Sequence, residues 1–319
     1  MTPGTQATRS IRRVLVIFPG ALGDLMCLMP ALDAISRRHP GASVELMARF
    51  ELARLVAGRS VVARAHSIDA REVGELFADE TSLNPSARRF FGEFDRIYSF
   101  FASDDARFRA RLAAASDAEV SFHPFRPGGD GHVSAAYLQA IGEDASPIDV
   151  RFEPTSDDLA AAARALAESK CDRSNLIVIF PGSGSPGKNW PADKFVALAS
   201  TLSLSNRASV VVILGPAEAS IEPIFREAGI CVLKDLDLPT VAAVARLASA
   251  FVGNDSGVSH LAAAAGASGV VIFGPTDPAR WRPLSAGGRI ETLQREPIDS
   301  VEVQDVARAL AKFVERQQR

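Results

Sequence analysis

The chain has 319 residues, of which 47% are hydrophobic and 23% are charged. That composition is ordinary for a globular protein, and the length suits two domains of roughly 100–200 residues each. The formal net charge of −3 argues against a general nucleic-acid binder, which usually carries a strong excess of basic residues.

Cysteine usage and hydropathy bear on the cellular compartment. Cys27, Cys171 and Cys231 lie far apart in the sequence and form no C-x-x-C pair, so we expect reduced thiols and no zinc site. The first apolar run, residues 14–18, is too short for a signal peptide, and no stretch approaches the roughly 20 apolar residues of a membrane span. We therefore expect a cytoplasmic protein, with surface association with a membrane left open.

Apolar runs alternate with helix-forming segments through the first half of the chain. Residues 14–18 form a continuous apolar run, which is typical of a central parallel strand covered on both faces. Further strands are predicted at 43–48, 61–66, 95–101 and 118–122, and helices at 25–38 (with a kink at Pro30), from 51, at 104–115 and at 132–141. The alternation predicts a doubly wound α/β domain.

Asp24 lies beyond the carboxyl end of the first predicted strand, where the turn at residues 19–24 leads into a helix. Ligands bind at that edge of open α/β sheets, and a carboxylate there can act as a general base. The alternative interpretation is an acidic residue in the first helical turn, where the helix dipole favours negative charge.

The second half of the chain repeats this pattern. Residues 176–182 echo residues 15–20, since each segment is a buried strand that runs into Phe-Pro-Gly and a turn, and this weak repeat indicates two similar halves facing each other across a cleft. The connection, residues 142–173, includes a helix at 157–169 whose predicted N-cap is Ser156. Beyond it, strands are predicted at 176–180, 209–214, 231–233, 250–252, 270–273 and 290–293, and helices at 191–204, 239–248, 258–265 and 301–316.

Two strand ends of the second half carry candidate ligand-binding residues. The turn at residues 182–189 nearly matches a P-loop, but Asn189 replaces the hydroxyl that holds magnesium, and Pro191 leaves Lys188 ahead of the helix. A glycine turn with a lysine after a strand still favours a phosphate contact, against the alternative of a solvated loop lysine. Glu218 follows the next strand, where a carboxylate commonly bonds ribose hydroxyls; its alternative is a glutamate at a helix start.

Residues 253–257, Gly-Asn-Asp-Ser-Gly, join a short strand to a helix. Backbone N–H groups and the positive end of the helix dipole then point at one spot, which suits a phosphate or diphosphate. His260, in the first turns of this helix, can donate a hydrogen bond to the same anion. The alternative is that Asp255 only caps the helix and that His260 is a structural histidine.

A series of motifs in this order resembles glycosyltransferase family 9, the bacterial heptosyltransferases of lipopolysaccharide assembly. The resemblance covers nearly the whole chain and rests on Ala21–Asp24 with Leu28–Leu32, Pro181–Ser183 with Lys188–Pro191, Gly215–Glu218, Asn254–Ala264, and Phe273–Pro278 with Trp281. It implies a GT-B fold, an α/β architecture of two Rossmann-like doubly wound domains that face a central cleft. Residues 1–155 would form the acceptor-binding domain and residues 156–319 the nucleotide-sugar-binding domain, with the terminal helix packing back on the first domain.

The resemblance also implies an inverting, metal-independent transfer that needs no cofactor. Carried over to the matching positions, Asp24 is the catalytic base, Ser183 and Lys188 contact the donor phosphates, and Glu218 binds the ribose. The diphosphate loop corresponds to Asp255, Ser256, Gly257, Val258 and His260. The departing nucleotide diphosphate gains charge, which a helix N-terminus and Lys188 would stabilise without a metal.

The implied partners are a nucleotide-diphosphate sugar, usually ADP-heptose in this family, and a glycan or lipopolysaccharide-core acceptor at the inner membrane surface; no nucleic acid is expected. Residues 49–130 carry no motif that identifies a particular acceptor sugar. One alternative is another nucleotide-sugar enzyme on the same architecture, such as an epimerase, or a P-loop-like nucleotidase, which a magnesium requirement would favour. The other is a nucleotide-sugar-binding protein without catalysis.

Overall fold

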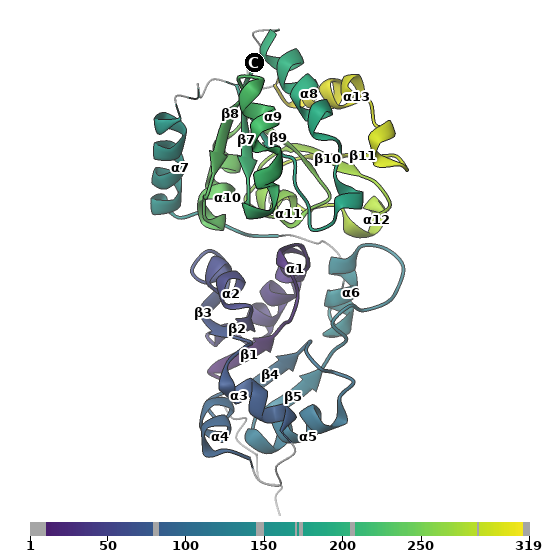
Figure 1. The fold of residues 1–319 in the computed structure, drawn as a ribbon. Helices are drawn as coiled ribbons and strands as arrows, with labels where there is room; N and C mark the ends of the chain where they lie inside the picture. The colour runs from purple at the N-terminus through teal and green to yellow at the C-terminus, as the bar shows by residue number, and fades with distance from the viewer. Residues whose placement is uncertain are drawn as a thin grey trace, which may run out of the picture. The chain divides into compact units, whose positions relative to one another are not determined.

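The computed structural model describes residues 11–78, 83–144, 150–169, 171, 175–204, 208–285 and 287–314. The chain divides into two compact units, each with its own sheet (Figure 1). The first unit comprises Met1–Gly20, Ala31–Pro127 and Ala140–Glu143, and the second comprises Ala21–Pro30, Gly128–Gln139 and Asp144–Arg319. The predicted division into an acceptor-binding part, residues 1–155, and a donor-binding part, residues 156–319, stays a prediction.

The first unit's sheet is centred on β1 (Arg13–Ile17) and has the order β3-β2-β1-β4-β5, with every neighbouring pair parallel. Residues 14–17 of β1 are fully buried, which confirms the predicted central strand covered on both faces. The other elements of the first half of the chain are α1 (Leu22–Arg38), β2 (Ser43–Ala48), α2 (Phe50–Val56), β3 (Val62–Ser67), α3 (Arg71–Gly74), η1 (Glu75–Phe77), α4 (Pro85–Phe91), β4 (Arg96–Ser99), α5 (Ala106–Ala115), β5 (Glu119–Phe122) and α6 (Val133–Ala140).

The second unit's sheet is also parallel throughout, with the order β11-β10-β9-β6-β7-β8. Two doubly wound sheets in one chain confirm the predicted α/β architecture. The elements of this half are α7 (Ser156–Glu168), β6 (Leu176–Phe180), η2 (Pro186–Lys188), α8 (Ala192–Leu204), β7 (Ser209–Leu214), η3 (Pro216–Ile221), α9 (Glu222–Glu227), β8 (Cys231–Lys234), α10 (Leu238–Leu247), β9 (Ala250–Asn254), α11 (Gly257–Ala264), β10 (Gly269–Phe273), α12 (Pro278–Trp281), β11 (Ile290–Gln294), η4 (Ile298–Ser300) and α13 (Val303–Val314).

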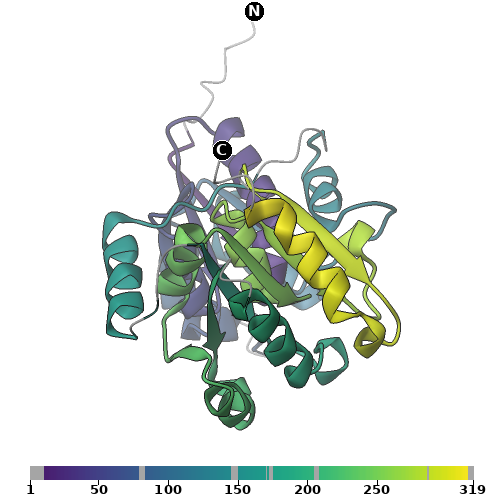
Figure 2. The same cartoon turned by 90° about the horizontal axis from the view of Figure 1, so that it is seen from above.

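Helices cover both faces of the second sheet. Along β6, Ile177 and Ile179 point into a core shared with α8, α9 and α13, whereas Val178 and Phe180 point into a core shared with α7, α10 and α11. Figure 2 shows α13, in yellow, beside α8 on the first of these faces. The terminal helix buries an apolar stripe, including Leu310 and Phe313, in the core of its own unit, and its packing on the first domain stays a prediction.

Helix α7 begins one residue away from its predicted cap. Thr155, not Ser156, is the N-cap, because its hydroxyl accepts a hydrogen bond from the Asp158 N–H while the Asp158 carboxylate accepts one from the Thr155 N–H. This reciprocal pair is a capping box. A threonine and a serine in succession offer equivalent hydroxyls, and the acidic residue three positions after Thr155 decides between them.

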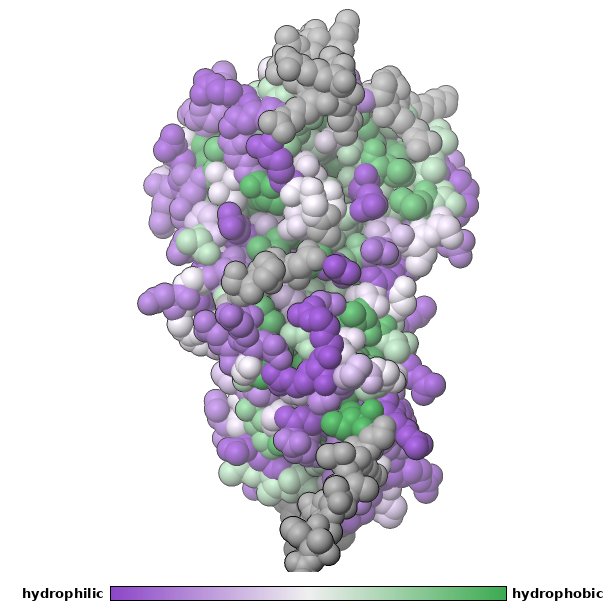
Figure 3. Space-filling view, turned by 180° about the vertical axis from the view of Figure 1, so that it is seen from behind, coloured by the Kyte–Doolittle hydropathy of each residue, from purple (hydrophilic) through white to green (hydrophobic). Residues whose placement is uncertain are grey.

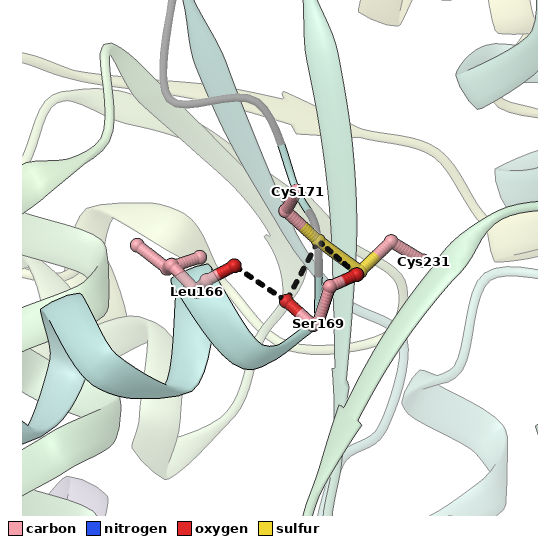
Figure 4. Close-up of a disulfide and its surroundings, with 4 residues drawn as sticks. All are labelled: Leu166, Ser169, Cys171 and Cys231. Carbon is pink, nitrogen blue, oxygen red and sulfur yellow. Dashed lines mark hydrogen bonds between the residues drawn. A yellow bond between two sulfur atoms is a disulfide. The ribbon is translucent and has the colours of Figure 1, made fainter.

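The expectation of three reduced thiols is wrong for two of the cysteines, because Cys171 and Cys231 form a disulfide (Figure 4). They are 60 residues apart in the sequence, yet their Cα atoms are 6.6 Å apart, since the chain after α7 lies beside the start of β8. The Ser169 hydroxyl, between the end of α7 and this bridge, donates to the Leu166 carbonyl and contacts Cys171 Sγ. Cysteine spacing alone could not reveal this contact.

Thiol titration tests both the disulfide and the burial of the remaining cysteine. Cys27 is 2% exposed, and burial, followed by the charge of Asp24, raises the pKa of its thiol to about 12. We expect no reaction of the folded, non-reduced protein with a thiol reagent at pH 8, one reactive thiol after unfolding in guanidinium, and three after reduction. Three thiols in the unfolded protein without reduction would contradict the disulfide.

The surface offers no broad apolar patch on the face seen in Figure 3, where hydrophilic residues separate the hydrophobic ones. Among the described residues, the large hydrophobic side chains that stay exposed lie on four different elements: Phe50 on α2, Phe77 on η1, Ile224 on α9 and Leu247 on α10. Within the described ranges, none of the helices has the combination of length and apolar character that crossing a bilayer requires.

Candidate functional site

The order in which the chain adds strands to the second sheet reverses at β6. From β6 the chain continues to β7 and β8 on one side, and it then returns to β9, β10 and β11 on the other. The loops after β6 and β9 therefore start side by side at the carboxyl edge and then diverge, which is where open α/β sheets bind ligands. The residues predicted to bind the donor all follow β6, β7 or β9.

Lys188 and Asp255 connect these two loops. Lys188 ends the short turn η2 after β6, and its Nζ donates a hydrogen bond of 2.7 Å to Asp255 Oδ2. The Asp255 side chain is only 6% exposed, whereas that of Lys188 is 32% exposed. The carboxylate is thus covered, and the pair fixes an ammonium group at the ligand-binding edge.

Asn254 joins the same two loops by hydrogen bonds. It was not predicted as a site residue. This last residue of β9 is fully buried; its Oδ1 accepts a hydrogen bond from the Trp190 N–H at 3.0 Å, and its Nδ2 donates to the Pro181 carbonyl at 2.7 Å. Both partners belong to the loop after β6, so Asn254 sets the position from which Lys188 reaches Asp255. A buried amide at the end of a strand, next to a glycine, was the signal available in the sequence.

The helix after β9 starts at Gly257, and its N-cap is Ser256. The Ser256 hydroxyl accepts a hydrogen bond from the Ser259 N–H, so the alternative in which Asp255 only caps this helix is wrong. The Ser259 hydroxyl donates to the Asn254 carbonyl at 2.7 Å, which closes the turn. A Cβ atom at Gly257 would lie 2.9 Å from Leu22 Cβ, so the helix N-terminus approaches the start of α1 closely.

His260 is 5% exposed and lies against the first turns of α1. Its Nδ1 is 3.7 Å from Cys27 Sγ, and its Cδ2 would be 3.5 Å from a Cβ atom at Gly23. Burial lowers the pKa of His260 to about 4; the charge of Asp255 opposes this shift and that of Lys188 adds to it. The imidazole is therefore neutral at pH 7 and can donate through one ring N–H, but not as a cation.

Asp24 lies in the first turn of α1, in the same stretch of helix as Gly23 and Cys27. It is 8% exposed, and its Oδ2 accepts a hydrogen bond from the Ala21 N–H at 3.1 Å. The carboxylate thus satisfies part of the helix N-terminus, as the alternative interpretation expected. That contact and a role as a base are compatible, because a carboxylate has two oxygen atoms.

Glu218 and Ser183 make local contacts. Glu218 Oε2 accepts a hydrogen bond of 2.9 Å from the Gly215 N–H at the start of η3. The Ser183 hydroxyl donates to the Ser185 carbonyl at 2.7 Å and so closes its own turn. The structure therefore brings Lys188, Asp255 and the start of α11 together, while Glu218 and Ser183 lie at neighbouring strand ends of the same edge.

No group of three or more His, Cys, Asp or Glu side chains with the arrangement of metal ligands occurs within the described part of the chain. What the edge offers an anion is Lys188 and the backbone N–H groups at the N-terminus of α11. This donor set fits a phosphate or diphosphate.

The amino-acid sequence is similar to that of a lipopolysaccharide heptosyltransferase. Lipopolysaccharide heptosyltransferase 1 of Escherichia coli O18:K1:H7 (strain RS218 / NMEC) is 22% identical over 324 residues, which cover 95% of this chain and 97% of that protein. The two proteins therefore align along nearly their whole lengths.

Solved structures show the same fold. The glycosyl transferase family 9 protein from Veillonella parvula DSM 2008 superposes with a TM-score of 0.78 at 17% identity, covering 96% of this chain and 97% of the other. ADP-heptose lipopolysaccharide heptosyltransferase II of E. coli superposes with a TM-score of 0.73 at 19% identity, covering 96% and 100%. Together with the two parallel α/β sheets, these likenesses confirm the predicted GT-B fold.

The comparison with protein-family models agrees with the sequence relative and with the solved structures. The model of glycosyltransferase family 9 (heptosyltransferase) matches residues 135–310, more than half of the chain. The matched region contains Lys188, Glu218 and the whole turn from β9 into α11. The chain therefore belongs to glycosyltransferase family 9 and is a glycosyltransferase.

Proposed function

We propose that this glycosyltransferase moves a heptose from ADP-heptose onto a hydroxyl group of a lipopolysaccharide-core acceptor. The observation that carries the proposal is the anion-binding edge of the second unit, where Lys188 and the N-terminus of α11 meet beside Asp255. The names of the E. coli relatives, a lipopolysaccharide heptosyltransferase and an ADP-heptose transferase, supply the sugar, the nucleobase and the type of acceptor.

The site can stabilise the leaving group. When the bond between the anomeric carbon and the diphosphate oxygen breaks, its electron pair goes to that oxygen, so negative charge grows on the diphosphate. Lys188 and the backbone N–H groups at the start of α11 then interact more strongly with it than with the intact donor. His260 contributes a neutral N–H donor. We propose that these groups make a metal ion unnecessary.

Asp24 is the proposed base. The acceptor oxygen attacks the anomeric carbon from the face opposite the diphosphate, so the configuration inverts, and its proton passes to the Asp24 carboxylate. The position of Asp24 supports this role. Asp24 lies in the first turn of α1 with Gly23, and both Gly23 and Cys27 of this helix lie close to His260 of α11.

The remaining assignments follow the order of the chain. We propose that residues 1–155 bind the acceptor and residues 156–319 bind the donor. In the donor part, Glu218 would accept hydrogen bonds from the ribose, Ser183 would contact the phosphates, and Ser256, Gly257 and Val258 would line the diphosphate loop. A cytoplasmic location with peripheral contact to the inner membrane is part of the same proposal.

Isothermal titration with ADP, UDP and GDP tests the donor assignment. We expect ADP to bind most tightly, with the same affinity in the presence and absence of EDTA. A preference for UDP or GDP would keep the glycosyltransferase but assign it a different donor. The absence of binding to all three nucleotides would contradict the proposed donor site.

Replacing Lys188 by alanine is expected to weaken ADP binding by about 1.5–3 kcal/mol, the scale of a hydrogen bond to a charged group. The loss has two causes: the ammonium group is removed, and the buried Asp255 carboxylate that it neutralised is left facing the diphosphate. Lys234→Ala is the matched control, because Lys234 forms an exposed ion pair with Glu222 in the same unit. Equal ADP affinities for the two variants would refute the role of Lys188.

Sugar transfer is expected to survive metal removal. In an assay that follows transfer from ADP-heptose, the rate after dialysis against EDTA should equal the untreated rate, because the positive groups at the leaving group are Lys188 and a helix N-terminus. A rate that disappears with EDTA and returns with magnesium would contradict the metal-free mechanism.

A further inference from the structure

The carboxylate of Glu218 lies against the backbone of two glycines. A Cβ atom built at Gly182, just beyond β6, would lie 2.1 Å from Glu218 Oε1 and 2.3 Å from its Cδ. A Cβ atom at Gly215, just beyond β7, would lie 2.9 Å from Oε2. The carboxylate therefore occupies the space that side chains would fill at both positions.

Neither glycine is required by its backbone conformation. Gly182 and Gly215 are absent from the glycines with positive φ within the described ranges, and Gly215 has a φ of −90°. An alanine could adopt either backbone without strain. At Gly182 the added methyl group would collide with the Glu218 side chain, which supplies the three atoms nearest to the added Cβ.

The position of the carboxylate follows from this arrangement. β6 and β7 are adjacent parallel strands, so Gly182 and Gly215 lie at neighbouring points of the ligand-binding edge. Oε2 accepts the Gly215 N–H, and Oε1 lies over Gly182. An ionised carboxylate can accept several hydrogen bonds, so it retains acceptor capacity beyond the single backbone N–H.

We propose that Gly182 is a specificity-determining positioning residue: it leaves the space in which Glu218 presents its carboxylate to a vicinal diol. The ligand chemistry is the 2′,3′-diol of a ribonucleotide, whose two hydroxyl groups can donate hydrogen bonds side by side to one carboxylate. This inference rests on the proposed function, in which Glu218 binds the donor ribose. If Gly182 instead served only to admit a glutamate that caps η3, its replacement would change stability without changing ligand choice.

The test compares the affinities of ADP and 2′,3′-dideoxy-ADP by isothermal titration. The wild type is expected to prefer ADP by about 10–100-fold, the range for hydrogen bonds to a charged acceptor. Gly182→Ala should reduce this preference to the value found for Glu218→Ala. Gly184→Ala is the matched control, because a Cβ atom there meets nothing within 4 Å in the same loop, and this variant should keep the wild-type preference.

A second variant tests the same inference without crowding the loop. Glu218→Asp keeps the charge but draws the carboxylate back from Gly182, so we expect it to lose the preference for ADP as well. The double variant Gly182→Ala with Glu218→Ala should bind ADP no more weakly than Glu218→Ala alone, because the alanine then has room.

The outcomes separate this inference from the proposed function. A Gly182→Ala or Glu218→Asp variant that keeps the wild-type preference for ADP would overturn the positioning role. Failure of the wild type to bind ADP, or an unchanged preference in Glu218→Ala, would instead remove the assignment of Glu218 to the ribose. Circular dichroism melting of each variant establishes that the compared proteins are folded.

Discussion

Replacing Asp24 by asparagine is expected to lower the rate of sugar transfer by about 10²–10⁴-fold, which is the usual contribution of a general base. Asparagine keeps the shape of the side chain and an oxygen that can accept the Ala21 N–H, but it cannot take up the acceptor proton. The measurement is kcat with ADP-heptose and a lipopolysaccharide-core acceptor, beside the affinity for ADP. We expect kcat to fall and ADP affinity to stay the same.

Asp33→Asn is the control for the Asp24 variant. Asp33 lies further along α1 and forms an ion pair with Arg37, one turn away, so its replacement should leave kcat unchanged. The competing interpretation is that Asp24 only stabilises the helix N-terminus. In that case Asp24→Asn would lower the melting temperature and keep the wild-type kcat, and the base would have to be sought elsewhere in the chain.

The sequence was most informative where local pattern determines structure. The apolar runs at residues 14–18 and 176–180 correspond to β1 and β6, the central strands of their sheets, because a strand covered on both faces must be apolar on both. The connections that follow these strands were also predicted, because each strand runs into Pro-Gly, a dipeptide that interrupts regular structure. The carboxyl edges of the sheets follow from these two features.

The side-chain partners were beyond what the sequence could show. Cys171 and Cys231 are 60 residues apart, and Cys27 and His260 are 233 apart, so neither periodicity nor spacing could pair them. Asp255 was considered as a helix cap, whereas the structure pairs it with Lys188 and gives the cap to Ser256. Each of these pairings joins segments that are far apart in the sequence, and local propensity does not encode which of them meet.

Among the charged residues of the first unit, Glu45 is expected to contribute most to stability. Its replacement by glutamine should lower the free energy of unfolding by about 2–3 kcal/mol at pH 7. Its side chain is 0% exposed on β2, where Arg13 of β1 donates to it at 2.8 and 3.0 Å and His66 of β3 lies at 2.7 Å. Both partners are about one-quarter exposed or less, so water weakens the pairs and the estimate lies below that for a fully buried ion pair.

The same residue predicts loss of stability in acid. Burial alone would raise the pKa of Glu45, but hydrogen bonds from His66 and Arg13 outweigh it and lower the pKa to about 2, from 4.5 for an unperturbed glutamate. The folded state therefore holds this proton less tightly than the unfolded state. The stabilisation, about 3 kcal/mol for this shift, is fully present above pH 4.5 and disappears as the pH falls toward 2.

Glu93→Gln is the matched control, because Glu93 forms an ion pair with the same Arg13 but its side chain is 51% exposed. This replacement should lower the free energy of unfolding by about 1 kcal/mol or less.

The measurement must report on the first unit. Both tryptophans, Trp190 and Trp281, belong to the second unit, so their fluorescence would miss this effect. Hydrogen exchange of the amides in β1, β2 and β3, read by mass spectrometry, reports on the first unit directly. The difference between wild type and Glu45→Gln should shrink by more than half between pH 7 and pH 3; a difference independent of pH would mean that Glu45 stabilises the sheet by packing rather than by its charge.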